Sequence, residues 1–116
     1  MVIAAPYTPA MTASSRLEKL QRLLAAEPDD PFCLYGIAQE HAKAGAIELA
    51  IEWYDRTIAA DPGHAYARFH KARLLEGLGR VDEARVELRL GLEAARAAGD
   101  AKAMSELAGA LEAIGG

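Results

Sequence analysis

The chain has 116 residues and a formal net charge of -4; 52% of its residues are hydrophobic and only 6% are aromatic. This length supports one domain with a modest core, and the apolar residues, which are mostly alanine and leucine, favour helices. Because the negative charge repels the phosphates of nucleic acid, we expect no nucleic-acid partner.

The first segment, residues 1–12, contains two prolines and shows no helical periodicity. We expect it to be a disordered lead that precedes a folded domain at residues 13–116. Met11 opens the stretch MTASSRLEKL, so translation starting at Met11 instead of Met1 is an alternative hypothesis.

The stretch SRLE predicts the start of the first helix, because Ser15 and Glu18 have the spacing of a capping box. Leucines then recur on one helical face, at Leu17, Leu20, Leu23 and Leu24. Pro28 ends this helix. Asp30 caps a second helix, with Pro31 at its first position.

Glycines and prolines mark the remaining helices. Gly45 ends the second helix in a left-handed cap, and a third helix runs from about residue 47 to residue 60. A fourth is expected at about 65–78 before Gly79, and a fifth at about 81–97 before Gly99. Asp100 caps a sixth. Since no strand signal is found, the sequence predicts an all-α fold of about six helices.

The chain repeats itself with a period of 34 residues: LAAEP at residues 24–28 returns as IAADP at residues 58–62. The same step pairs Pro28 with Pro62, Ala38 with Ala72, Gly45 with Gly79, Glu48 with Asp82 and Ala50 with Ala84. Such a period is typical of stacked helical hairpins, in which small residues let neighbouring helices approach closely.

Residues 31–64 resemble the tetratricopeptide repeat family, whose motif orders apolar, small and aromatic residues along one hairpin. The matching residues are Leu34, Ile37, Ala38, His41, Ala50, Tyr54, Thr57 and Pro62. Residues 65–98 resemble the motif less well, because Arg68 and Lys71 stand at usually apolar places and Arg96 at that of proline. Residues 13–28 resemble the second half of a repeat, and residues 100–114 a capping helix. The resemblance implies a small, bacterial-type member of the family with a right-handed superhelix of hairpins.

In this family the first helix of each repeat lines a concave groove. The resemblance implies that this groove binds a peptide or helix of an unknown protein partner, through Phe32, Tyr35, Gln39, Lys43, Tyr66, Phe69, His70, Arg73 and Lys102. Helical spacing supports this groove independently of the resemblance, because Tyr66, Phe69 and Arg73 share one helix face. An alternative is that Phe32 and Phe69 are core residues, which fill gaps left by Arg68 and Lys71.

Some family members grip the C-terminal carboxylate of a chaperone with lysine and asparagine side chains. In this chain Tyr35 stands where the clamp has its first lysine, His70 where it has an asparagine, and Glu106 where it has an arginine. The C-terminal tails of chaperones are therefore poor candidates for the partner. Binding of an acidic or carboxylate group on some other peptide by Arg73 and Lys102 stays an open alternative.

No motif indicates catalysis, a metal or a cofactor. The three histidines lack metal-ligand spacing, and Cys33 belongs to no thiol-protease signature. The sequence therefore predicts a non-enzymatic interaction module or adaptor. Self-assembly through the ends of the helical stack is the alternative, with a monomer favoured over a homodimer.

The expected location is the cytoplasm. No stretch reaches the roughly 18 apolar residues of a membrane span, and MVIAA does not read as a signal peptide. The single Cys33 cannot form an internal disulfide, which fits a reducing compartment.

Overall fold

The computed structural model describes residues 8–116, with side chains from residue 15 onward. This part contains six helices and no strand: α1 (Thr8–Ala26), α2 (Pro31–Lys43), α3 (Ile47–Ala60), α4 (Ala65–Gly77), α5 (Val81–Ala98) and α6 (Ala101–Ala113). The predicted all-α fold is confirmed. Among these helices, none combines the length and the apolar character that crossing a bilayer requires.

The predicted start of the first helix is wrong. α1 begins at Thr8, so Ser15 lies inside a continuous helix and does not cap it. Residues 8–12 of the expected lead therefore belong to α1, while residues 1–7 lie outside the described residues. The stretch TPAMT accounts for the longer helix, because proline is favourable in a first turn and alanine and methionine are good helix formers.

The other helix ends follow the predicted signals. Asp30 caps α2 by accepting a hydrogen bond from the Phe32 amide at 3.0 Å, and Asp100 caps α6 by accepting from the Ala103 amide at 3.0 Å. The predicted turn glycines have positive φ angles, with 82° at Gly45, 79° at Gly79 and 70° at Gly99. These local signals set the lengths of the helices.

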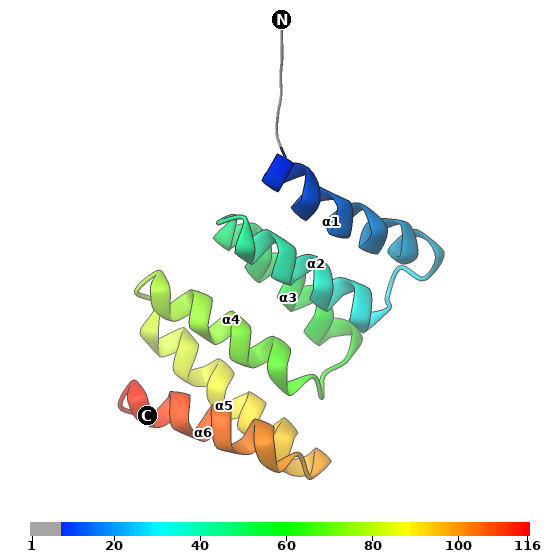
Figure 1. The fold of residues 1–116 in the computed structure, drawn as a ribbon. Helices are drawn as coiled ribbons and strands as arrows, with labels where there is room; N and C mark the ends of the chain where they lie inside the picture. The colour runs from blue at the N-terminus through cyan, green and yellow to red at the C-terminus, as the bar shows by residue number, and fades with distance from the viewer. Residues whose placement is uncertain (1–7) are drawn as a thin grey trace, which may run out of the picture.

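The helices form an open stack of antiparallel hairpins (Figure 1). α2 pairs with α3 and α4 with α5, while α1 packs on α2, α3 on α4 and α5 on α6. α1 and α6 lie at opposite ends (Figure 1). The predicted small residues sit between the helices: Ala38, Ala50 and Ala84 are 0% exposed and Ala72 is 1% exposed.

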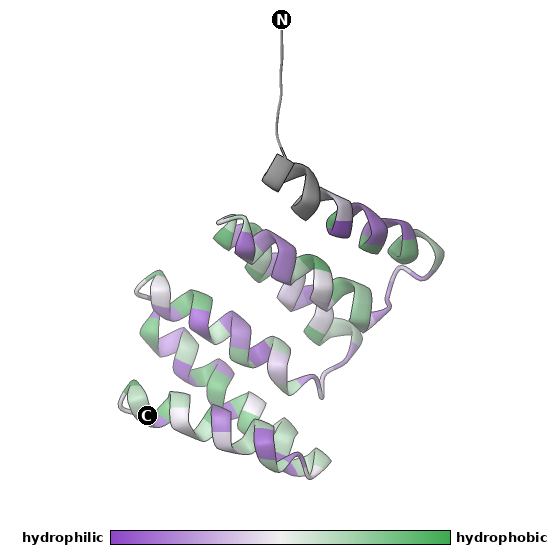
Figure 2. Ribbon diagram, in the orientation of Figure 1, coloured by the Kyte–Doolittle hydropathy of each residue, from purple (hydrophilic) through white to green (hydrophobic). Residues whose placement is uncertain are grey.

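Polar and apolar residues alternate along each helix, as expected for helices that bury only part of their surface (Figure 2). At the end of the stack, Leu20 of α1 packs on Gly36 of α2, where a methyl group added to Gly36 would lie 2.9 Å from a Leu20 methyl carbon. Glycine thus permits the close approach of α1 to α2.

The departures from the repeat motif at Arg68 and Lys71 are compensated by ion pairs. The Arg68 guanidinium lies 3.1 Å from a carboxylate oxygen of Glu87 on α5. The Lys71 ammonium lies 3.2 Å from Glu87 and 2.6 Å from Asp55 on α3. Burial acts to lower the pKa of Lys71, but the two carboxylates outweigh it, and the pKa is raised. This ion-pair network joins α3, α4 and α5.

Candidate functional site

One face of the stack is formed by α2, α4 and α6, with α3 and α5 behind them (Figure 1). The residues expected to bind a partner lie on these three helices. We call this face the groove. Two hollows on this face lie beside α2 and between α4 and α6.

An aromatic cluster occupies the middle of the groove. Its members come from α2, α3, α4 and the turn before α4, and they are Tyr35, Tyr54, His64, Tyr66, Phe69 and His70. The ring of Tyr35 lies 4.6 Å from that of His64, centroid to centroid, and the His70 ring stacks on Tyr54 at 6.0 Å. Phe69 meets His70 edge to face at 5.2 Å. The rings thus connect the two hairpins across α2, α3 and α4.

The structure brings Tyr35, Tyr66, Phe69 and His70 together in this cluster. Phe32 is 68% exposed at the start of α2, so the alternative that it is a core residue is wrong. Phe69 is half-buried and also packs against the main core. It therefore serves both the groove surface and the packing beneath it.

A hollow of about 420 Å³ lies beside the cluster and is lined by Arg16, Gln39, Ala42, Lys43, Tyr54 and His70. Glu40, with 4% of its surface exposed, pairs with two of these lining residues. One Glu40 oxygen accepts from the Arg16 guanidinium and lies 3.0 Å from the Lys43 ammonium. Burial acts to raise the pKa of Glu40, but these two cations outweigh it and hold the pKa below 4.5. Glu40 therefore fixes two basic side chains at the rim of the hollow.

The second hollow, of about 230 Å³, is lined by Arg73, Glu76, Ala110 and Ala113. The Arg73 guanidinium lies 5.7 Å from the centre of the Phe69 ring, within range of a cation–π interaction. Lys102 is exposed on α6 and does not line either hollow. The groove thus continues from the α1 end toward α6.

The ionisable rings of the cluster are held in their uncharged forms. Burial lowers the pKa of His70, and the nearby charge of Arg73 lowers it further. Burial also lowers the pKa of His64, whose Nδ1 accepts a hydrogen bond from the Ala67 amide at 3.1 Å. Burial raises the pKa values of Tyr35 and Tyr54. At neutral pH the cluster is an uncharged aromatic surface beside cations.

The predicted groove residues do not include several residues of this site, among them Tyr54, His64 and Arg16. Tyr54 matches a packing position of the repeat motif, His64 falls at a repeat boundary, and Arg16 lies in the half repeat. The histidine in the first position before a helix was the available signal for His64, because a side chain there can cap the helix. Nothing in the local sequence indicates that Arg16 reaches the hollow.

Cys33 does not have the environment of a nucleophile. It is 1% exposed, and its thiol donates to an Asp30 carboxylate at 3.4 Å. Burial and the Asp30 carboxylate raise the pKa of the thiol, which favours the less reactive protonated form. Within residues 8–116, no group of three or more histidine, cysteine or acidic side chains is arranged to hold a metal ion.

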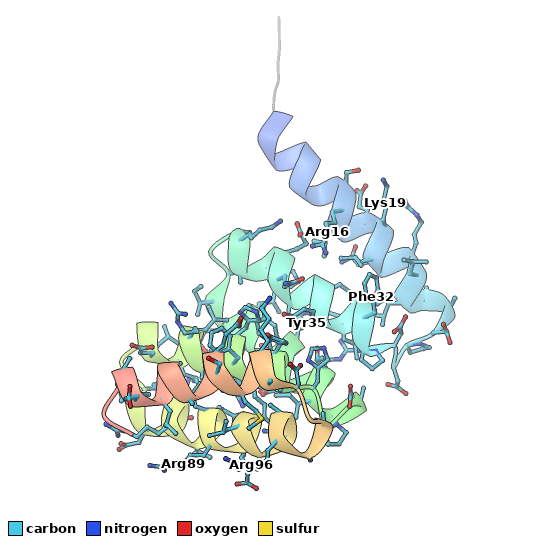
Figure 3. The ribbon with its side chains drawn as sticks, turned by 60° about the horizontal axis from the view of Figure 1, so that its bottom comes forward. Arg16, Lys19, Phe32, Tyr35, Arg89 and Arg96 are labelled. Carbon is cyan, nitrogen blue, oxygen red and sulfur yellow. The ribbon has the colours of Figure 1, made fainter. Side chains whose placement is uncertain are left out.

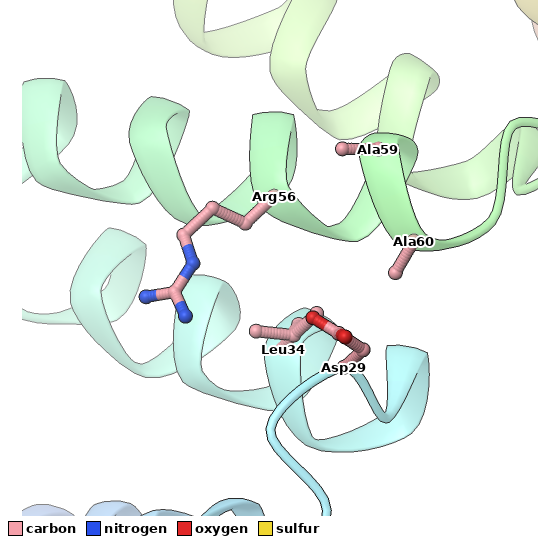
Figure 4. A pocket seen from close by; sticks show the side chains of 5 residues that line it. All are labelled: Asp29, Leu34, Arg56, Ala59 and Ala60. Carbon is pink, nitrogen blue, oxygen red and sulfur yellow. The ribbon is translucent and has the colours of Figure 1, made fainter.

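A separate pocket of about 490 Å³ lies between α3 and the start of α2, and none of its lining residues belongs to the predicted groove (Figure 4). Arg56 lines this pocket, and its guanidinium lies 4.1 Å from the centre of the Trp53 ring. The other lining residues are Asp29, Leu34, Ala59 and Ala60. This pocket lacks the linked aromatic rings of the groove.

Comparisons with known proteins agree with this architecture. Residues 41–111, more than half of the chain, match the family model described as tetratricopeptide repeat. A tetratricopeptide repeat domain protein from Salinibacter ruber is 34% identical, with a TM-score of 0.70, and the match covers 73% of this chain and 94% of that chain.

Two further matches are more distant or partial. The Yersinia enterocolitica type III secretion chaperone SycD, in complex with a peptide of the translocator YopD, is 23% identical with a TM-score of 0.80; 91% of this chain and 82% of that chain are covered. Superkiller protein 3 from Saccharomyces cerevisiae is 31% identical over 70 residues, which are 60% of this chain. The chain spans only 5% of that yeast protein.

Proposed function

Because this chain belongs to the tetratricopeptide repeat family, we propose that it is a non-enzymatic interaction module that binds a peptide or helix of another protein in its groove. The observation that carries the proposal is the aromatic cluster beside the 420 Å³ hollow, in which every ring except the buried Tyr54 is partly exposed. Stacked helical repeats present extended concave surfaces of this kind to their partners.

The chemistry of the groove suits a protein segment. Large aromatic side chains and arginine dominate the energetics of protein interfaces, and this groove offers Tyr35, Tyr66 and Phe69 together with Arg73. Its rings are uncharged at neutral pH, so apolar side chains of a partner can pack on them without desolvating a charge. Gln39 adds an amide that both donates and accepts hydrogen bonds.

The fold similarity to SycD supports the same use of this architecture, since that chaperone is seen in complex with a peptide of YopD. The identity of 23% carries over the fold and not the partner. A reducing, cytoplasmic setting is part of our proposal, because the single Cys33 is a buried free thiol.

The test compares groove variants with a matched surface variant. Tyr66→Ala combined with Phe69→Ala is expected to abolish capture of the native partner in a pull-down, while the helical circular dichroism is retained. Phe32→Ala should weaken capture by roughly tenfold or more without changing Tm, because Phe32 is 68% exposed. Val86→Ala on α5 is the control, since Val86 is also exposed, at 50%, but lies outside the groove. Unchanged capture by the folded groove variants contradicts the proposal.

Self-assembly through α1 is a second candidate function. Leu23 of α1 is 56% exposed, whereas Thr57, at the equivalent position of α3, is 0% exposed and Gly91 of α5 is buried. Leu23 lines a hollow of about 350 Å³ with Lys19 and Arg22, which a second copy can cover. Light scattering over a range of concentrations tests this, because a constant monomer mass rules it out. If dimers form, Leu23→Glu should abolish them.

A further inference from the structure

The basic side chains at the α1 end of the groove stand out against the charge of the chain. The formal net charge is -4, yet the 420 Å³ hollow is lined by the cations Arg16 and Lys43 and by no acidic side chain. Figure 3 shows Arg16 between α1 and α2. The overall composition of the chain is acidic and does not account for a basic hollow. The charge of the hollow therefore depends on which side chains the fold brings together there.

Glu40 neutralises this cluster only in part. Two cations face one carboxylate, which leaves one positive charge. Both cations engage the same oxygen of Glu40, and their side chains remain 46% exposed for Arg16 and 67% exposed for Lys43. An arginine carries five N–H donors and a lysine three, so most of their donors remain free to contact a ligand.

We infer that Arg16 and Lys43 receive a side-chain carboxylate of an acidic segment that binds in the groove; this inference rests on the proposed function. Charge-assisted hydrogen bonds from arginine and lysine to a carboxylate are among the strongest in proteins. Tyr54 and His70 form the adjoining wall of the hollow. The recognised feature is therefore an aspartate or glutamate next to an apolar residue.

The carboxylate belongs to a side chain and not to a chain terminus, because the groove continues past this point. The second hollow lies farther along the same face, between α4 and α6, and Arg73 lines it. A segment that fills both hollows runs past Arg16 and Lys43 on its way to α6. An acidic side chain within the segment then meets the basic cluster.

The competing explanation is that the cluster only fastens α1 to α2. The chain contains a control group, because Arg68 and Lys71 both pair with Glu87, Lys71 pairs with Asp55 as well, and none of Arg68, Lys71 and Glu87 lines either hollow. The test variant is Arg16→Gln/Glu40→Gln/Lys43→Gln, and the control variant is Arg68→Gln/Lys71→Gln/Glu87→Gln. Both remove the same charge and keep amides that can hydrogen bond. Lys43→Gln alone preserves the Arg16–Glu40 pair and serves if the triple variant does not fold.

The probes are fluorescent 12-residue peptides with amidated C-termini, selected from a random display library on the wild-type protein. We expect the selected peptides to be enriched in Asp and Glu next to apolar residues. The test variant should bind them about tenfold more weakly, which corresponds to about 1.4 kcal/mol, and the control variant within about twofold of wild type. Changing the acidic peptide residue to its amide should weaken binding to the wild-type protein by the same factor of about ten, and should change binding to the test variant little.

The other outcomes separate the two proposals. Peptides that bind in the groove without acidic enrichment, or equally to wild type and test variant, overturn the carboxylate assignment and leave the proposed function standing. Binding that requires a free C-terminus also overturns it, because the ligand is then a terminal carboxylate. If the wild-type protein selects no peptide, the proposed function fails and the inference fails with it.

Discussion

The hairpins α2–α3 and α4–α5 place different side chains at equivalent positions. In α2–α3 the contact is apolar, with Leu34 1% exposed, Ile37 0% exposed and Trp53 half-buried. In α4–α5, 34 residues later, the same positions hold Arg68, Lys71 and Glu87, which form an ion-pair network. The backbone plan of the two hairpins is nevertheless the same.

This difference shows which positions determine how closely the two helices of a hairpin pack. Ala38 and Ala72 are equivalent, as are Ala50 and Ala84, and all four are buried. Small residues at these points fix how closely the helices approach. Around them, an apolar contact and a hydrogen-bonded ion pair are both accepted, because each leaves no buried polar atom without a partner among the described residues.

The largest effect is expected from the apolar hairpin. Ile37→Ala should lower the free energy of unfolding by about 2–5 kcal/mol, because it removes a fully buried side chain and leaves a cavity. Chemical denaturation followed by circular dichroism measures this loss. Lys71→Ala, at the equivalent position of the other hairpin, should cost less. A larger loss for Lys71→Ala contradicts the view that the apolar hairpin depends more strongly on packing.

A smaller effect is expected from the ion-pair network. Glu87→Ala should lower the free energy of unfolding by about 1–3 kcal/mol, because it leaves Arg68 and Lys71 partly buried with a carboxylate partner removed. Lys71 still pairs with Asp55, which limits the loss. Denaturation at low and at high salt measures the effect and its screening.

The control for this network replaces its three charged residues with the apolar residues of the α2–α3 hairpin. Arg68→Leu/Lys71→Ile/Glu87→Trp introduces the residues found at the equivalent positions of α2–α3. Its stability should stay within about 1–2 kcal/mol of wild type or exceed it, because well-packed apolar residues often replace a buried ion pair at no cost. A loss as large as that of Glu87→Ala shows that the α4–α5 site is shaped for charges.

The smallest effect concerns the pH dependence of stability, and it distinguishes two of the junctions between neighbouring hairpin units, α1–α2 and α3–α4. At the α3–α4 junction, the pKa values of His64 and His70 are lowered below 6.5, mainly by burial, so the unfolded chain binds more protons than the folded one as pH falls below about 6.5. Their contribution to stability is therefore present above this pH and lost below it. At the α1–α2 junction, Glu40 loses its contribution only below about pH 4.5.

Tm measured from pH 7 to pH 5 should therefore fall for wild type and fall less for His70→Gln. Arg73 and His64 act to lower the pKa of His70 and Glu106 acts to raise it, so Glu106→Gln should steepen the fall. An identical pH dependence of wild type and His70→Gln removes His70 as the source of the effect.

Much of the fold could be predicted because its signals are local. Asp30 and Asp100 cap their helices as expected, and the glycines at 45, 79 and 99 adopt left-handed turns. The start of α1 was misjudged because a capping box at Ser15 and a proline at position 9 are competing local signals for the same helix. The stretch alone does not decide between them.

The candidate site could be predicted only in part. Tyr35, Tyr66, Phe69 and His70 share faces of α2 and α4, and the repeat spacing places them on one side. Tyr54 and Arg16 lie on the second helices of hairpin units, so helical spacing assigns them to packing and to solvent. They join the hollow because α1 docks on α2, and α3 on α4.

The sequence by itself determined the helices, their ends apart from the start of α1, and the order in which they stack, since helical periodicity, caps and turns act between residues close in the chain. Only the tertiary structure decided that Glu40 holds Arg16 and Lys43 at one rim, and that His70 stacks on Tyr54. The Arg16–Glu40 and Tyr54–His70 contacts join residues 24 and 16 positions apart, and both depend on how closely one helix approaches the next. That distance is set by small residues such as Gly36 and Ala38, whose effect appears only when the helices pack.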